Sequence, residues 1–324
     1  MWQREQDVLI IDDYGSSAGQ SYTIGLDFVA RSGQIVAQYS GIERLVVKGT
    51  WYADTFYADT FELPVSSVGP QVELDGRSGF DTLAGADVST TWNVTGAGRG
   101  TVGQVSFGAF EHLSGGSGAD TFVVSAAGFL AGQMDGGSGQ DTLDYSAYRS
   151  GVTVSLVDGT ATAIAGGISS IENVTGSRYS DLIVGDNGNN ILIGNGGDDI
   201  LVGLAGRDKL VASGGRSVLI GGLGSDELFG GRDEDLLIGG STIFDTDRTA
   251  LVMLLSVWQN RQQDYRVRIA DLKVGVIAGQ RLVRLAADTV SSDSDADKLL
   301  GSDGLDWLWA SIDDITDRNP LHEA

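Results

Sequence analysis

The sequence predicts an all-β protein, built as a repeating solenoid with a small mixed α/β cap near its C-terminal end. Three observations predict this fold. A nine-residue phrase recurs in tandem, glycine is frequent in it, and an aliphatic residue stands at the same place in every copy. A fixed period is the signature of stacked repeat architectures. Helix is disfavoured, because each glycine costs a helix about 1 kcal/mol relative to alanine.

The tandem array runs from Gly176 to Ile238 without an insertion. Six polar, glycine-rich residues followed by three apolar ones predict a turn and a very short strand, because glycine readily adopts the positive φ of tight turns. The phrases are GSRYSDLIV, GDNGNNILI, GNGGDDILV, GLAGRDKLV, ASGGRSVLI, GGLGSDELF and GGRDEDLLI. Position eight predicts one continuous core column, formed by Ile183, Leu192, Leu201, Leu210, Leu219, Leu228 and Leu237.

Upstream of the array the same phrase occurs singly. GTWYADTFY begins at residue 49, GRSGFDTLA at 76, GGSGADTFV at 115 and GGSGQDTLD at 136. Between them lie alternating segments rich in Val, Thr and Ser, which predict strands. Asp81 and Asp141 lie about sixty residues apart, as do Glu111 and Glu172. We therefore predict about three degenerate solenoid modules over residues 1–175, continuous with the array at 176–240.

After Gly240 the pattern changes to apolar residues at helical spacing. Asp245 or Asp247 could cap a first helix whose apolar face would hold Leu251, Leu254, Leu255 and Trp258. The phrase then returns as SDSDADKLL and GSDGLDWLW. Because a solenoid leaves its last coil as an open edge, we predict that residues 241–324 form a helical and short-strand cap.

Composition excludes some partners and chemistries. Acidic residues outnumber basic ones 44 to 21, and the net charge of −23 disfavours nucleic acid. No cysteine is present, which excludes disulfides and thiolate metal sites. His112 and His322, the two histidines, cannot form an H-E-x-x-H zinc centre. No apolar run is long enough for a membrane span.

At GGLGSDELF and its neighbours the sequence resembles the RTX family, the haemolysin-type calcium-binding nonapeptide repeats with pattern G-G-x-G-x-D-x-U-x. The resemblance implies a right-handed parallel β-roll or β-helix whose turns alternate between two edges. Position-six residues 18 apart would then share one edge, where a hard cation between carboxylates converts repulsion into attraction. One edge would carry Asp181, Asp199, Ser217 and Asp235, and the other Asn190, Asp208 and Asp226.

The family's ligand positions imply specific calcium ligands here. Carbonyls at positions one and three of one turn, and at two and four of the overlying turn, would join the carboxylates. The best site would use Gly203, Ala205, Asp208, Gly222, Gly224 and Asp226. The other expected metal-site residues are Gly176, Asp181, Gly185, Asn187, Asn190, Asn195, Gly197, Asp199, Gly206 and Asp235.

The expected sites differ in quality. Asp181 and Asp199 form an intact pair, although Arg178 and Tyr179 replace the usual turn residues. Asn190 with Asp208 keeps oxygen ligands but has one charge fewer. The sites on either side of Ser217 should be weak or empty.

Stacked aspartates can also form a solvated turn face, since Asp stabilises turns by its own backbone hydrogen bonds. Both interpretations stay open for the phrases without a tandem partner, which hold Asp54, Asp81, Asp120, Asp141, Asp297 and Asp306.

The function that these features predict is a non-enzymatic, calcium-dependent folding module of a secreted, extracellular or cell-surface bacterial protein. Its partner would be Ca²⁺, with a cell-surface or polysaccharide partner unidentified. The opening segment Asp7–Ile10 resembles the end of a repeat, so we expect a C-terminal piece of a longer protein. The alternative is a β-helix polysaccharide lyase or epimerase, for which Tyr145, Tyr148 and Arg149 are scattered candidates.

Overall fold

The computed structural model describes residues 8–40, 42–58, 71–278, 281–311 and 313–317. It divides into two compact units. Unit 1 comprises Met1–Asp144 and Thr160–Ile171, and unit 2 comprises Tyr145–Gly159 and Glu172–Ala324. Residues 145–159 and 160–171 thus belong to different units, which the repeat spacing does not reveal.

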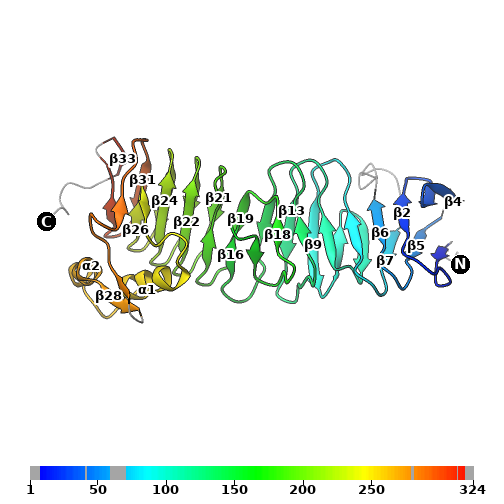
Figure 1. Ribbon diagram of the computed structural model, residues 1–324, viewed down its shortest axis with the longest axis horizontal. Helices are drawn as coiled ribbons and strands as arrows, with labels where there is room; N and C mark the ends of the chain where they lie inside the picture. The colour runs from blue at the N-terminus through cyan, green and yellow to red at the C-terminus, as the bar shows by residue number, and fades with distance from the viewer. Residues whose placement is uncertain (1–7, 41, 59–70, 279–280, 312, 318–324) are drawn as a thin grey trace, which may run out of the picture. The chain divides into compact units, whose positions relative to one another are not determined.

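Unit 2 is a stack of short strands in which each phrase of the array contributes one rung (Figure 1). Its strands are β16 (Thr153–Ser155), β19 (Asn173–Thr175), β20 (Leu182–Val184), β21 (Ile191–Ile193), β22 (Ile200–Ala205), β23 (Lys209–Val211), β24 (Val218–Leu223), β25 (Glu227–Gly231), β26 (Leu236–Ile238), β27 (Ser241–Thr242), β28 (Val276–Ala278), β29 (Arg281–Val283), β30 (Val290–Ser291), β31 (Lys298–Ser302), β32 (Trp307–Trp309) and β33 (Ile315–Thr316).

Successive phrases alternate between two parallel sheets. Within unit 2 one sheet has the order β19-β21-β23-β25-β31-β33 and the other β16-β20-β22-β24-β26-β32. Each strand pairs with the strand two phrases later, as Leu182 does with Ile200 and Ile191 with Lys209. The predicted all-β fold with parallel sheets is confirmed, and this arrangement is consistent with a β-roll. The hand of the coil stays a prediction.

The core of the array is the column predicted from position eight. All seven of its aliphatic side chains have no exposed surface, from Ile183 to Leu237. One such residue per phrase fills the space between the two sheets, so each coil buries apolar area only by stacking on its neighbours.

Two helices lie beside one sheet of unit 2. Helix α1 (Arg248–Trp258) is capped by Asp247, whose side chain accepts from Ala250 N–H, and α2 (Tyr265–Val274) is capped by Asp264. The predicted apolar face of α1 is buried. It packs on the outward side chains of β20, β22, β24 and β26, where positions seven and nine are aliphatic: Leu182, Val184, Ile200, Val202, Val218, Ile220, Leu236 and Ile238.

The helices interrupt the stack and do not close it. Strand β31 pairs in parallel with β25, and β32 with β26, in the register of the repeat. The segment that we predicted as a cap over 241–324 therefore holds further coils after the helices. Strands β27 and β30 pair at the point where the chain leaves the stack and rejoins it. We call the segment between these two strands, which contains both helices, the insert.

Unit 1 is also built from parallel strands in two sheets, with coils of unequal length. Its strands are β1 (Val8–Asp12), β2 (Ser21–Ile24), β3 (Phe28–Arg31), β4 (Gln34–Gln38), β5 (Arg44–Lys48), β6 (Thr55–Ala58), β7 (Gln71–Asp75), β8 (Thr82–Ala84), β9 (Thr91–Gly96), β10 (Arg99–Val102), β11 (Val105–Gly108), β12 (His112–Ser114), β13 (Thr121–Val124), β14 (Met134–Asp135), β15 (Thr142–Asp144), β17 (Thr160–Ala161) and β18 (Ile168–Ser169).

The parallel order of unit 1 is broken twice by antiparallel strands. One sheet runs β1-β5-β7-β11-β10-β9-β13-β15, with β10 antiparallel to both neighbours. The other runs β18-β14-β12-β8-β6-β2-β3-β4, and its last three strands form antiparallel pairs. Aromatic stacks take the place of the aliphatic column, as between Tyr22 and Phe56 and between Trp92 and Phe122.

Candidate metal centre

The position-six residues of the array form two hydrogen-bonded columns. In each column the side-chain Oδ1 accepts a hydrogen bond from the backbone N–H of its counterpart in the preceding coil, 18 residues earlier. The N–H of Asp181 donates to Asp199 at 2.9 Å, and that of Asp208 to Asp226 at 2.8 Å. Ser217 keeps its place, since its hydroxyl accepts from Asp199 N–H. The structure thus brings together the side chains that the sequence places on each edge.

The isolated phrases also have stacked partners, which the sequence did not show. Beyond the helices, the N–H of Asp226 donates to Asp297 at 2.9 Å across 71 residues. In unit 1 the N–H of Asp54 donates to Asp81, 27 residues on, and that of Asp120 to Asp141, 21 residues on. Because the coils differ in length, no fixed spacing could have revealed these pairs.

In several turns the second carboxylate oxygen is buried and receives no hydrogen bond from any described residue. These orphan Oδ2 atoms belong to Asp81, Asp199, Asp208, Asp226 and Asp235. A buried carboxylate without a partner is costly unless a positive charge compensates it.

The position-one glycine forms part of a cradle around the orphan oxygen. A Cβ on Gly203 would lie 2.3 Å from Asp208 Oδ2 and 2.5 Å from the Gly221 carbonyl oxygen. A Cβ on Gly221 would likewise lie 2.5 Å from Asp226 Oδ2 and 2.4 Å from the Gly239 carbonyl. Carboxylate and carbonyl oxygens therefore converge on the space that glycine leaves open. The carbonyls of Gly221 and Gly239 join the candidate ligands, although the sequence analysis did not name them.

In other turns, a residue of the same turn donates a hydrogen bond to the corresponding side-chain oxygen, and we call these capped turns. Ser177 donates its N–H to Asp181 Oδ2 at 2.7 Å and its hydroxyl to Oδ1 at 2.9 Å. Thr50 does the same for Asp54, with its N–H 2.6 Å from Oδ2. In the turn of Asn190 the side-chain oxygen accepts from Asp186 N–H.

Backbone conformation at position two separates the two kinds of turn. In turns with an orphan oxygen this residue is left-handed, with φ of 72° at Asn195, 82° at Leu204 and 113° at Gly222. The Gly222 N–H then donates to the next coil, at the Gly239 carbonyl, instead of to the carboxylate. The expected pair of Asp181 with Asp199 is therefore unequal, because Asp181 is capped. In the sequence, a capped turn is marked by Ser, Thr or Asp at position two.

Burial makes the orphan carboxylates hard to ionise. Desolvation, together with the charge of neighbouring carboxylates, raises the pKa of Asp199, Asp226 and Asp235 to about 8. The same burial raises the pKa of Asp208 to about 7. A cation beside such groups favours the ionised form and lowers their pKa.

The donors present fit a hard cation that binds oxygen. Among described residues, no three His, Asp or Glu side chains converge on a single point, so backbone carbonyls would have to complete any site. Asp208 and Asp226 would hold Ca²⁺ together with carbonyls of their two turns, and the ion would supply the positive charge that the buried carboxylates lack. The residues on this edge thus fit the predicted metal.

The turn of Ser217 departs from this pattern in two places at once. Position one is Ala212 instead of glycine, and position six is a hydroxyl instead of a carboxylate. The Ala212 methyl group therefore meets no Oδ2, which a Cβ at Gly194 or Gly203 would approach to 2.2 or 2.3 Å. Next to Ser217, Arg216 pairs with Glu234 at 2.5 Å, and the same Glu234 oxygen accepts from Arg268 of α2 at 2.6 Å. An arginine pair thus lies beside the turn that lacks the acid.

Comparison with known families agrees with this geometry. A family model of the RTX calcium-binding nonapeptide repeat matches residues 175–210, 211–241 and 286–314, in four copies. These segments are RTX repeats, and the last of them lies after the helices. A search of curated proteins found no match.

Proposed function

We propose that this chain is a non-catalytic, calcium-dependent folding module of an exported or cell-surface bacterial protein. The observation that carries the proposal is the set of buried carboxylate oxygens that the described residues leave without a donor. RTX repeats are calcium-binding elements, and exported bacterial proteins are their usual setting.

Calcium would make folding depend on whether the chain is inside or outside the cell. A ligand that binds only the folded chain, at 100 times its Kd, stabilises that chain by about 2.7 kcal/mol per site. Extracellular modules bind Ca²⁺ with a Kd of about 10⁻⁴ to 10⁻³ M, well above cytosolic concentrations. With a net charge of −23, the chain would stay unfolded inside the cell by self-repulsion and fold outside it.

One observation favours a non-catalytic module over the polysaccharide lyase or epimerase. Tyr145, a candidate for a catalytic groove, has no exposed surface and packs edge-on against Tyr148. Among described residues no helix has the length and apolar character needed to cross a membrane.

Circular dichroism during calcium titration of metal-free protein tests the proposal. We expect a gain of β signal. Asp208→Asn should shift the midpoint to higher calcium, because it removes a ligand charge but still accepts the hydrogen bond from Asn190 N–H. The matched control is Asp181→Asn, which changes a capped carboxylate and should shift the midpoint less. A circular dichroism spectrum that does not change when calcium is added would overturn the proposal.

A further inference from the structure

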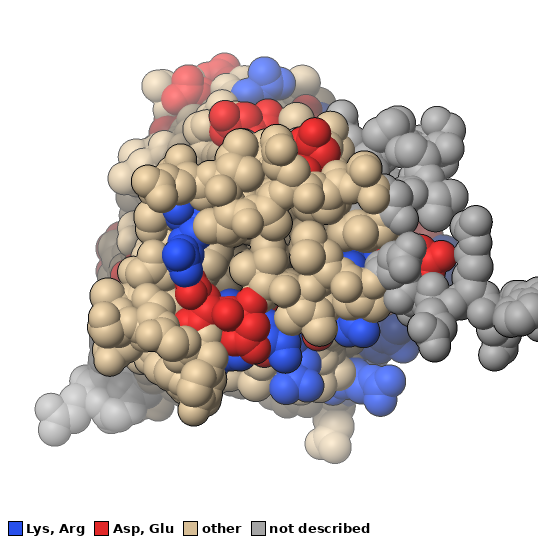
Figure 2. Space-filling view, turned by 90° about the vertical axis from the view of Figure 1, so that its right-hand side faces the viewer, with Lys and Arg blue, Asp and Glu red and all other residues tan. Residues whose placement is uncertain are grey.

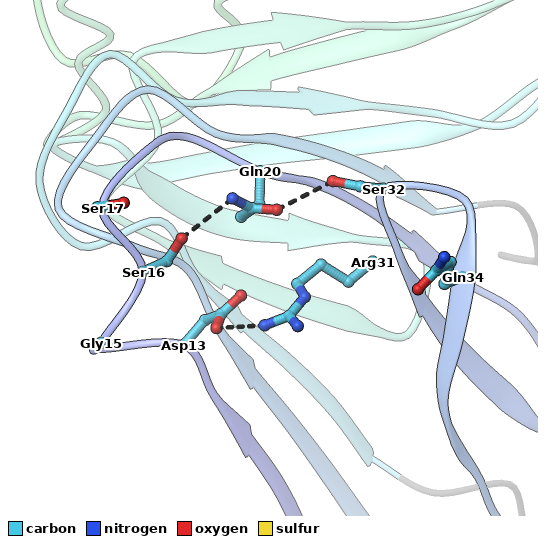
Figure 3. Close-up of a pocket in the computed structure, with 8 residues that line it drawn as sticks. All are labelled: Asp13, Gly15, Ser16, Ser17, Gln20, Arg31, Ser32 and Gln34. Atoms are coloured by element: carbon cyan, nitrogen blue, oxygen red, sulfur yellow. Dashed lines mark hydrogen bonds and ion pairs between the residues drawn. The ribbon is translucent and has the colours of Figure 1, made fainter.

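A polar pocket of about 600 Å³ lies at the end of unit 1 that holds β2, β3 and β4 (Figure 3). Its walls come from two segments. The turn after β1 contributes Asp13, Ser16 and Gln20, and the hairpin of β3 and β4 contributes Arg31, Ser32 and Gln34. Figure 3 shows these side chains arranged around a common space.

Hydrogen bonds hold most of this ring in place without a ligand. Arg31 pairs with Asp13 Oδ1 at 2.6 Å, while Tyr22 donates its hydroxyl to Oδ2 at 2.8 Å. The Gln20 amide donates to Ser16 Oγ at 3.0 Å and accepts from Ser32 Oγ at 2.9 Å. Carboxylate, amide, guanidinium and hydroxyl groups are thus preorganised, which lowers the entropy lost on binding.

An exposed aromatic pair stands next to the pocket. Tyr14 is 64% exposed and Trp51 is 50% exposed, and their rings meet edge to face at 5.5 Å. Arg77 lies near both rings, 5.7 Å from Tyr14 and 5.8 Å from Trp51, and its own pairing with Asp12 fixes it. Two large rings are therefore held in place while remaining open to solvent.

The aromatic pair and the pocket share one piece of backbone. Tyr14 lies between Asp13 and Gly15, which both line the pocket. The loop that ends at Gln20 packs on the turn of Trp51, since Gln20 N–H donates to Asp54 Oδ1 at 2.6 Å and Thr55 N–H to the Gln20 carbonyl. The two features form one continuous surface.

This surface begins where a carboxylate column ends. Gln20 occupies the position-six place of its coil, so a neutral amide replaces the carboxylate there. The β3–β4 hairpin, which closes the pocket, is antiparallel and adds nothing to the parallel stack. Both departures from the repeat coincide at the pocket.

Charges at this end are largely paired. Asp13 pairs with Arg31, and Asp12 with Arg77. Figure 2 looks onto this end and shows acidic and basic side chains side by side among mostly uncharged residues. An acidic ligand would gain little here and would be repelled by the chain as a whole.

We propose that Tyr14, Trp51 and the pocket around Gln20 bind a neutral oligosaccharide. A sugar ring offers a face of C–H groups, which suits the electron-rich face of an aromatic ring. Its neighbouring hydroxyls both donate and accept, matching the amide of Gln20, the carboxylate of Asp13 and the hydroxyls of Ser16 and Ser32. This site goes beyond the calcium proposal and does not depend on it.

Saturation-transfer NMR with the full chain in calcium-containing buffer tests the site. The probes are cellohexaose, maltohexaose, mannohexaose and, as the acidic comparison, trigalacturonate. We expect transfer to at least one neutral hexasaccharide, and a Kd raised at least about tenfold in both Trp51→Ala and Gln20→Ala. Phe129→Ala is the matched control, because Phe129 is a 42% exposed aromatic residue elsewhere in unit 1.

Three results would overturn the site. They are no transfer to any neutral hexasaccharide, binding of trigalacturonate that equals or exceeds neutral binding, and binding that Trp51→Ala and Gln20→Ala weaken no more than Phe129→Ala does. Circular dichroism of each variant in calcium shows whether it is folded. Trp51→Phe, which keeps an aromatic ring, should restore most of the affinity that Trp51→Ala loses.

Discussion

At the scale of single residues, the first and sixth positions of a phrase act as one unit. Glycine at position one leaves room for the aspartate oxygen at position six, since a Cβ on Gly194 would lie 2.2 Å from Asp199 Oδ2. The phrase that lacks this glycine, at Ala212, also lacks the aspartate, at Ser217. One steric relation thus accounts for both the rule and its exception.

We predict that Gly203→Ala destabilises the calcium-bound protein by about 1–3 kcal/mol, because the new methyl group would overlap Asp208 Oδ2 and the Gly221 carbonyl. Bound calcium should also fall. Urea unfolding and equilibrium dialysis measure the two effects. Gly214→Ala is the control, since a Cβ there meets nothing within 4 Å. Equal losses in both variants would show that the cradle has no special role.

At the scale of elements, the insert is fastened to the array by polar contacts as well as by its apolar face. Arg268 is fully buried, lies 5.1 Å from the Trp258 ring centre and pairs with Glu234. Trp258 Nε1 donates to the Glu234 carbonyl at 2.9 Å. These contacts meet the array next to Ser217, where a carboxylate is missing, so the insert stabilises that edge without metal.

We predict that Arg268→Ala lowers the free energy of unfolding by about 2–3 kcal/mol, because it breaks a buried ion pair and removes packing against Trp258. Its effect should be similar with and without calcium, wherever the chain is folded enough to measure. Arg261→Ala removes a more exposed pair with Asp198 and should cost less than about 1 kcal/mol. Chemical denaturation in both conditions compares the variants, and a loss seen only with calcium would contradict this role.

The sequence predicted the array more fully than what surrounds it. The nine-residue period was enough for the turns, the short strands and the core column, because every coil from Gly176 to Ile238 has the same length. It could not place Asp54 on Asp81, since unequal loops hide the register. The sequence also contained a sign that helices cover one sheet, which we did not use. Position seven is apolar on the covered sheet, at Ile200 and Val218, but charged on the other sheet, at Lys209 and Glu227.

At the scale of the whole molecule, buried acids link stability to pH. Asp199, Asp226 and Asp235 have a folded-state pKa of about 8, against about 3.9 for an unfolded aspartate. Between these values the folded chain holds protons that the unfolded chain has released. Stability without metal is therefore greatest at low pH and is lost as the pH rises toward about 8.

We predict that the melting temperature of metal-free protein falls from pH 5 to pH 8. Saturating calcium should remove or reverse the trend, because the ion binds the deprotonated carboxylates and competes with protons. Differential scanning calorimetry on resin-stripped protein, with and without added calcium, measures both curves. A metal-free melting temperature that rises over this interval would show that the buried acids are ionised without the ion.

The pairing of β27 with β30 has a consequence for how such proteins diversify. Because Ser241 lies opposite Ser291, the chain leaves and rejoins the stack at adjacent points, and the rungs on either side keep their register. A different domain whose two ends lie close together would therefore fit at this junction in place of the insert. The coils on either side would still stack in the same register.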